Sequence, residues 1–327
     1  MKLLIAIAMS SLTLLSQAQV TGAGSSFAGP LYSKWAADYN KETGITVNYQ
    51  PTGSGAGMNQ IAAKTVDFAG TDDPVNQDEI KTKGYYQFPT AVGGVVPVIN
   101  LKGVETGKLV LDGKTLADIF QRKITNWNDS AIVKLNPGLT LPDQPIMLVV
   151  RADSSGTTAV YTDFLSKVNE DFKKNVGTGK SVIWGKEGIA AGKGNAGVAA
   201  YVQQLVGSIG YVEYAYVKQA KMNYVVMKNR KGQLVLPDDT TFAISAKSAN
   251  WDVPGFAVDL NNLDGWPITA ATFAIIYKEN GPRTKDVVKF FDWAFTKGDK
   301  IATDLDYLIL PDKVKAKIRG DWAREIK

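Results

Sequence analysis

The chain has 327 residues, of which 45% are hydrophobic and 21% are charged, a composition typical of a globular protein of roughly two domains. It contains no His and no Cys, which excludes a Ser-His-Asp triad, a Cys-His pair, a disulfide and a zinc site built from His and Cys. The formal net charge of +5 is modest and favours anionic partners.

Residues 1–18 have the pattern of a secretory signal. Lys2 gives a short positive start, an apolar stretch follows from Leu3 to Leu15, and Ser16-Gln17-Ala18 resembles a cleavage site. A membrane span needs about 20 apolar residues, which is more than this stretch provides. We therefore predict cleavage after Ala18 and export of a soluble mature chain.

The first part of the mature chain alternates helical and strand patterns. Leu31 and Trp35 have helical spacing, while residues 45–50 alternate apolar and polar side chains as a strand does. Asp73-Pro74 is typical of an N-cap and the first helical residue, and Gly84 of a helix end. The predicted elements are a helix at 30–40, a strand at 45–50, a short helix near 58–62, a strand at 65–70 and a helix at 74–83.

The rest of the chain continues this alternation. Strands are predicted at 92–101, 147–150, 210–216 and 273–277, with a helix at 157–168 and two closing helices around Phe291 and Ile318. Strands that alternate with helices predict an α/β fold with mostly parallel sheets. Because no flexible linker divides the chain, we expect two lobes joined by crossing strands, with the candidates at 93–101 and 266–277.

Three turns rich in Gly and hydroxyl residues each open a predicted helix. They cover residues 21–27, 52–57 and 151–157, and the last two follow predicted strands. The first N–H groups of a helix lack internal partners, and Gly allows a ligand to approach the backbone closely, so such turns form anion sites. For a single turn, ordinary helix capping is the simpler interpretation; three together favour an anion site.

Two charged residues stand out in these turns. Arg151 directly follows a predicted buried strand and can present its fork to a tetrahedral oxyanion; the alternative is a surface charge paired with Asp153. Asp73 is predicted as a cap, which leaves Asp72 as either a solvated loop residue or an acceptor in the site. Phosphate near neutral pH carries a proton that it can donate to a carboxylate, whereas sulfate has none. A buried acceptor can therefore discriminate by about 10⁴- to 10⁵-fold.

Two other glycine-rich segments resemble nucleotide motifs. Residues 177–181 end like a phosphate loop, but Lys174 stands where that motif requires Gly. Residues 192–197 match a dinucleotide fingerprint literally, but no clear strand is predicted before them. We interpret residues 192–197 as a loop capping the helix that contains Val198 to Leu205, and we predict no nucleic-acid partner.

Seven motifs together resemble the phosphate-binding proteins of bacterial high-affinity phosphate ABC importers. The resemblance extends over essentially all of the mature chain and rests on specific combinations of residues. These are Thr21-Gly22-Ala23-Gly24, Tyr49-Gln50 before Gly53-Ser54, Thr65-Val66-Asp67-Phe68 before Asp72, Phe88-Pro89-Thr90, Arg151-Ala152-Asp153 with Ser155-Gly156-Thr157, Gly210-Tyr211-Val212-Glu213-Tyr214, and Trp266-Pro267-Ile268-Thr269.

The resemblance implies a two-lobed periplasmic-binding-protein fold of type II that closes on one phosphate without chemistry. It implies a signal at 1–18, a first lobe of residues 19–94 plus 268–327, and a second lobe of residues 95–267. Either Ser25 or Ser26 could supply the first hydroxyl, although position 26, often Thr in relatives, is the matching one. Asp153 would pair with Arg151. The implied phosphate ligands are Ser26, the Phe27 backbone N–H, Ser54, Asp72, Arg151, Ser155, Gly156 and Thr157.

The same resemblance implies a periplasmic monomer that delivers phosphate to the membrane permease of an ABC transporter, with no cofactor and no metal. One alternative is a binding protein for another tetrahedral oxyanion, which Asp72 argues against. A second is a secreted phosphatase on a similar scaffold, which the missing His and the lack of an Asp-rich metal motif argue against. A third is an adhesion or signalling module with this fold.

Overall fold

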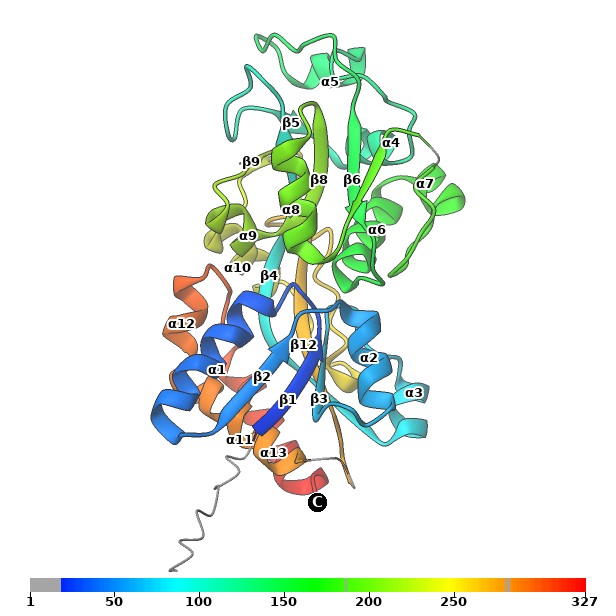
Figure 1. Cartoon of the computed structure of the whole chain (residues 1–327). Helices are drawn as coiled ribbons and strands as arrows, with labels where there is room; N and C mark the ends of the chain where they lie inside the picture. Colours follow the sequence, from blue (N-terminus) through cyan, green and yellow to red (C-terminus); the bar gives the residue numbers. More distant parts are fainter. Residues whose placement is uncertain (1–18, 186, 280, 282) are drawn as a thin grey trace, which may run out of the picture.

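The protein consists of two α/β lobes, one above the other in Figure 1. The computed structural model describes residues 19–185, 187–279, 281 and 283–327, so the predicted signal lies outside the described residues. Within those ranges, no helix combines the length and the apolar character that crossing a membrane requires. The predicted two-lobed α/β fold is confirmed.

The lower lobe is a five-stranded sheet in the order β2-β1-β3-β12-β4, covered by helices on both faces (Figure 1). β1 pairs in parallel with β2 and β3, whereas β12 pairs antiparallel with β3 and β4. Its elements are β1 (Gln19–Gly24), α1 (Gly29–Thr43), β2 (Thr46–Gln50), α2 (Ser54–Ala62), β3 (Phe68–Thr71), α3 (Gln77–Lys83), the first part of β4 (Tyr85–Asn100), β12 (Thr269–Tyr277), α11 (Thr284–Lys297), α12 (Asp299–Asp304) and α13 (Asp312–Glu325).

The upper lobe continues the sheet in the order β4-β8-β6-β7 and adds a small sheet, β11-β10-β5. β6 pairs in parallel with β7 and β8. The elements are β5 (Val110–Leu111), α4 (Gly113–Phe120), α5 (Ser130–Leu135), β6 (Met147–Arg151), α6 (Gly156–Val168), α7 (Glu170–Asn175), β7 (Ile189–Gly192), α8 (Gly194–Gln204), β8 (Ser208–Glu213), α9 (Tyr214–Gln219), β9 (Asn223–Tyr224), β10 (Val226–Lys228), β11 (Leu234–Val235) and α10 (Asp239–Lys247). The 3₁₀ turn η1 (Pro254–Phe256) follows in the chain but packs on the lower lobe, where Gln77 Nε2 donates to Pro254 O at 3.1 Å.

The long strand β4 connects the lobes. Residues 85–94 pair with β12, and residues 95–100 pair with β8 of the upper lobe. The chain returns beside it, where Val95 N donates to Ile268 O at 2.8 Å and the Trp266 indole N–H donates to Val95 O at 2.9 Å. The predicted crossing strands are therefore present. The residue boundaries of the lobes stay our proposal.

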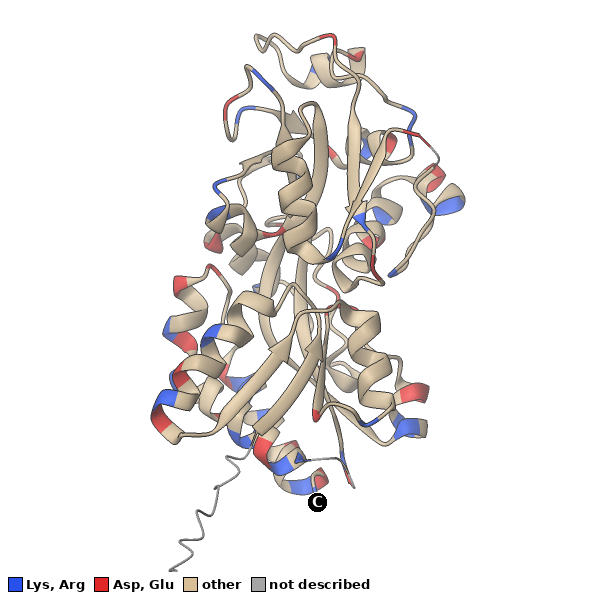
Figure 2. Ribbon diagram, viewed as in Figure 1, with Lys and Arg blue, Asp and Glu red and all other residues tan. Residues whose placement is uncertain are grey.

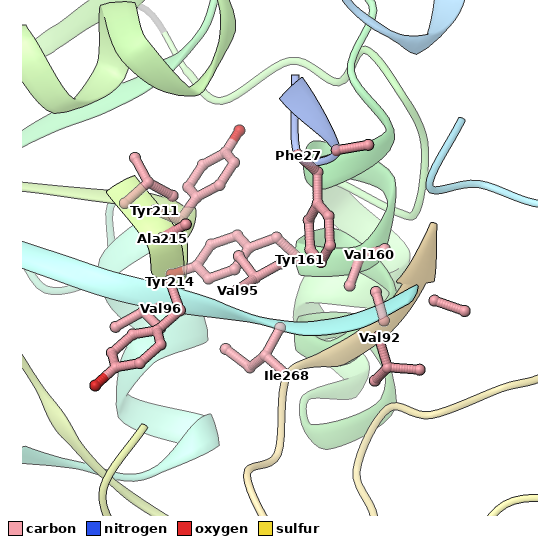
Figure 3. Close-up of a cluster of buried hydrophobic side chains, with 14 of the residues drawn as sticks. Phe27, Val92, Val95, Val96, Val160, Tyr161, Tyr211, Tyr214, Ala215 and Ile268 are labelled. Atoms are coloured by element: carbon pink, nitrogen blue, oxygen red, sulfur yellow. The ribbon is translucent and has the colours of Figure 1, made fainter. Parts of the chain in front are cut away.

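A continuous apolar cluster fills the junction beside β4 (Figure 3). Phe27 from the lower lobe and Val95 of β4 lie close to Val160 and Tyr161 of α6 in this view. Tyr161 stacks on Tyr211 with ring centroids 4.2 Å apart. Because burying apolar surface stabilises by about 25 cal/mol per Å², this cluster anchors the turn after β1 and the start of α6 against the same strand.

Several local predictions need correction. α3 starts at Gln77 and is capped by Asn76, whose side chain accepts from Glu79 N at 2.8 Å. Asp73 is not the cap, because it lies in the preceding loop and forms an ion pair with Lys180 at 3.1 Å. The strand predicted at 65–70 is β3, which starts only at Phe68, and the one predicted at 210–216 ends at Glu213, which caps α9. The sheets are mixed rather than mostly parallel, because β4 and β12 run antiparallel across the junction.

Candidate functional site

The three predicted turns meet between the lobes. The turns after β1 and β2 belong to the lower lobe, and the turn between β6 and α6 belongs to the upper lobe. Gly55 N donates to Ser154 O at 3.0 Å, and Gly156 N donates to Ser54 Oγ at 3.1 Å, so the lobes touch directly here. Figure 2 shows most charged residues on outer helices and loops, whereas Asp72 and Arg151 are buried at 3% and 8% exposure.

Asp72 is held at the bottom of the site by hydroxyl groups. Ser25 Oγ donates to Asp72 Oδ1, and Thr272 Oγ1 donates to the same oxygen at 2.8 Å. The other oxygen, Oδ2, has Thr157 Oγ1 at 3.5 Å across the lobe boundary. Burial raises the pKa of Asp72 to about 6, although the two hydroxyls and Arg151 act in the opposite direction. One carboxylate oxygen is thus saturated and the other faces the opposite lobe.

Arg151 ends β6 with its guanidinium held in one orientation. Its Nε and Nη2 donate to the two oxygens of Asp153 at 2.9 and 2.5 Å, and Asp153 also accepts from Gly194 N at 2.9 Å. Burial acts to raise the pKa of Asp153, but Arg151 holds it below its usual value. The predicted pairing is confirmed. Arg151 Nη1 is buried and has no hydrogen-bond partner in the described part of the chain. That group can donate to an anion between the lobes.

The start of α6 supplies helix N-terminal groups from the upper lobe. Ser155 caps the helix, since its Oγ accepts from Thr158 N at 3.0 Å, and its own proton remains available to donate. A Cβ on Gly156 would lie 2.5 Å from Ser54 Oγ and 2.8 Å from Asp72 Oδ2. Only Gly permits this approach of the lobes. Partial positive charge at the first turn of α6 then faces the site.

The two neighbouring serines of the first turn have different environments. The Ser25 hydroxyl is directed at Asp72, whereas Ser26 Oγ accepts from Asn195 of the upper lobe. The carbonyl of Phe27 accepts from the Tyr307 hydroxyl at 2.6 Å, which fixes the backbone of this turn, and the Phe27 ring is fully buried. The structure therefore brings all eight predicted site residues to one place, with Ser25 turned toward the carboxylate.

Sequence reasoning missed two residues of the site. Thr272 lies on β12, 200 residues from Asp72, and no local pattern marks it. Asn195 lies in the segment 192–197, where we predicted a capping loop without a preceding strand. The predicted absence of a strand was wrong, because β7 ends at Gly192 and leads into the segment, whereas the predicted helix is confirmed as α8, which starts at Gly194. This is a fourth strand–turn–helix, although its turn contains no hydroxyl residue. The signal was weak because β7 is only four residues long and its first three residues are partly or fully exposed.

A metal centre has no visible basis in the described ranges. No group of three or more Asp and Glu side chains with metal-ligand geometry occurs in that part of the chain. The site instead combines hydroxyls, backbone N–H groups, one guanidinium and one carboxylate, which is a set suited to binding a small oxyanion through hydrogen bonds.

Comparison with known proteins agrees with this geometry. The PBP superfamily domain model matches residues 13–297. "Phosphate-binding protein PstS" of Pasteurella multocida is 48% identical over 99% of this chain and 96% of its own, and that of Haemophilus influenzae is 48% identical over 94% and 93%. A phosphate-binding protein of Stenotrophomonas maltophilia shares the fold with a TM-score of 0.70 at 21% identity, covering 92% of this chain and 93% of its own. The chain belongs to the PBP superfamily and, within it, to the family of PstS phosphate-binding proteins.

Proposed function

We propose that this protein binds inorganic phosphate with high affinity between its lobes and delivers it to an ABC importer by lobe closure. Relatives that are 48% identical over nearly the whole chain carry the name phosphate-binding protein. The proposed ligands are the eight residues that meet between the lobes: Ser26, Phe27 through its N–H, Ser54, Asp72, Arg151, Ser155, Gly156 and Thr157.

The observation that carries this proposal is the pair of opposite groups in the site. Arg151 offers a buried Nη1 donor that has no partner within the described residues, and Asp72 offers Oδ2 as an acceptor 3.5 Å from Thr157 Oγ1. An anion that satisfies both must accept from a guanidinium and donate to a carboxylate. A protonated phosphate does both, whereas sulfate at neutral pH can only accept.

The cellular setting is part of the same proposal. We propose export by cleavage of the signal after Ala18, a periplasmic location, a monomeric state and docking of the closed form on permease subunits. We also propose that the protein uses neither a cofactor nor catalysis, because a chain without His and Cys lacks the commonest nucleophile and base pairs. The binding of phosphate through hydrogen bonds needs none of these.

Calorimetric titration of the mature protein with phosphate, alone and with a large excess of sulfate, tests the proposal. We expect one phosphate per chain and an affinity that sulfate changes little. Absence of phosphate binding, or displacement by sulfate at similar concentration, would contradict it and favour another oxyanion. Incubation with a chromogenic phosphate ester tests for a phosphatase, and we expect no turnover above the buffer rate.

A further inference from the structure

The side-chain amide of Asn195 lies between hydroxyls that come from both lobes. Its Nδ2 donates to Ser26 Oγ of the lower lobe at 2.9 Å and to Thr157 Oγ1 of the upper lobe at 3.2 Å. Its backbone N–H also donates to Ser26 Oγ, at 3.0 Å. Asn195 is fully buried, so each of these bonds forms away from water.

The orientation of this amide is fixed by Glu213. The Glu213 backbone N–H can only donate, and it lies 2.8 Å from Asn195 Oδ1. The oxygen of the amide must therefore face β8, and the NH₂ group must face Ser26 and Thr157. The amide uses three of its four hydrogen-bonding positions and has no alternative arrangement with these partners.

This arrangement determines where the Ser26 proton goes. A hydroxyl has one proton and two acceptor positions, and the two donors from Asn195 occupy both acceptor positions of Ser26. The Ser26 proton must then be donated to a third group. Thr157 Oγ1 also accepts from Asn195, which turns its proton toward Asp72 Oδ2 and the space between the lobes.

We propose that Asn195 is a positioning residue that directs the Ser26 and Thr157 protons at the bound anion and couples this to lobe closure. The inference rests on the proposed phosphate site and extends it. Ser26 and Asn195 lie in different lobes, so the arrangement forms only when the lobes meet. Donors that already point at the ligand need no reorientation on binding, which strengthens their contribution.

A double-mutant cycle tests this role through phosphate affinity measured by calorimetry. The variants are Asn195→Ala, Ser26→Ala and both together. Alone, Asn195→Ala should weaken phosphate binding by about 10- to 30-fold, the range for loss of a buried hydrogen-bond arrangement. In the Ser26→Ala background the same change should cost less than about 3-fold, because the Ser26 proton is gone and Asn195 then orients only the Thr157 proton. Equal losses in both backgrounds would overturn the proposal.

Asn195→Asp gives a readout that a merely structural role would not produce. A carboxylate has no donor, so Ser26 and Thr157 would donate to it instead of to phosphate, and we expect a loss on the order of 100-fold at pH 8. Protonation restores one donor at lower pH. The loss relative to the wild type at the same pH should therefore shrink between pH 8 and pH 5. A loss that is constant over this range argues against the proposal.

Asn136→Ala is the matched control. Asn136 is also a buried bridging amide of the upper lobe, bonded to both backbone groups of Val110 and to Ile132 O, but it lies outside the site. It should lower the melting temperature and leave phosphate affinity within about 2-fold. An equal affinity loss would assign the Asn195 effect to general destabilisation.

The outcomes also distinguish a failure of the proposed phosphate binding from a failure of the proposed role of Asn195. If Asn195→Asp does not fold, the alanine cycle alone decides. A wild-type protein that does not bind phosphate overturns both the proposed function and this role. Tight wild-type binding with an additive cycle overturns only the role of Asn195.

Discussion

Each lobe places one aspartate at the boundary between the lobes, Asp72 buried and Asp153 partly buried, and the two have opposite environments. Asp72 of the lower lobe is surrounded by the hydroxyls of Ser25 and Thr272, and burial raises its pKa to about 6. Asp153 of the upper lobe is paired through both oxygens with Arg151, which holds its pKa below the usual value despite burial. The same side chain is thus an available acceptor in one lobe and a fully used support in the other.

From this difference we propose that the upper lobe attracts the negative charge of the ligand and that the lower lobe recognises its proton. Asp153 uses its charge to orient the guanidinium, so Arg151 keeps only Nη1 for a ligand. Asp72 has no cation bonded to it in the described residues, and its Oδ2, which has the long 3.5 Å contact from Thr157 Oγ1, can still accept from a ligand. The predictions below test this division of roles.

The largest effect is expected from Arg151→Ala, which removes the cation and leaves Asp153 unpaired beside the anion. Truncating one partner of a buried charge pair costs about 2 to 5 kcal/mol, so phosphate affinity should fall on the order of 1,000-fold. Calorimetric titration with phosphate measures this loss of affinity. Arg122→Ala is the control, because the Arg122 guanidinium donates to Ile146 O at 2.8 Å and not to a residue of the proposed site. Comparable losses of phosphate affinity in both variants would contradict the proposed role of Arg151 as a ligand.

Asp72→Asn should act on selectivity more than on affinity. Its amide can donate to sulfate, so we expect the ratio of phosphate to sulfate affinity to fall by about 100-fold. Competitive titration with both anions measures that ratio. Asp153→Asn sharpens the comparison between the lobes. It should weaken the binding of phosphate and of sulfate to a similar extent, because it disturbs only the orientation of the Arg151 guanidinium. An unchanged ratio for Asp72→Asn contradicts the assigned acceptor role.

Gly156→Ala tests whether phosphate binding requires the two lobes to approach each other closely at Gly156. The new Cβ would lie within 2.8 Å of Asp72 Oδ2 and closer to Ser54 Oγ, so closure has to stop short. Overpacking of this kind costs about 1 to 3 kcal/mol, and we expect roughly 30-fold weaker phosphate binding with a nearly unchanged melting temperature. Gly320→Ala on α13 is the control, since nothing lies within 4 Å of its Cβ position. Wild-type affinity in Gly156→Ala would mean that closure tolerates a wider gap.

The smallest effect is expected in how the free energy of unfolding depends on pH. The raised pKa of Asp72 means that the folded protein binds this proton more tightly than the unfolded chain. The resulting stability is fully present below about pH 4 and is lost as pH rises through about 6. Relative to ligand-free wild type, Asp72→Asn should therefore gain on the order of 1 to 2 kcal/mol in unfolding free energy between pH 4 and pH 7. Urea unfolding measures this.

Asp153→Asn should give the opposite sign in the same experiment. Its lowered pKa contributes stability above the usual aspartate range, and that stability is lost as pH falls. The variant should therefore resemble the wild type most closely at acid pH. Parallel pH curves for the two variants would show that the carboxylates do not differ as the structure indicates.

Local chemistry made much of the site predictable. A turn of Gly and hydroxyl residues before a helix has the same unpaired N–H groups in any fold, so residues 52–57 and 151–157 could be identified from spacing alone. The predicted helix cap at Asp73 was wrong, because Asp73-Pro74 and Asn76 are both plausible caps locally. Asp73 instead pairs with the distant Lys180, and Asn76 caps the helix.

The sequence by itself determined the chemical inventory: no His and no Cys, an α/β alternation, one Arg after a buried strand and the candidate carboxylates Asp72 and Asp153. Only the tertiary structure decided how these groups are used. The bonds of Asp72 to Thr272 and of Ser26 to Asn195 join residues 200 and 169 positions apart. Such contacts leave no periodic signal along the chain, because the direction of a hydroxyl proton depends on donors and acceptors that folding alone brings within 3 Å.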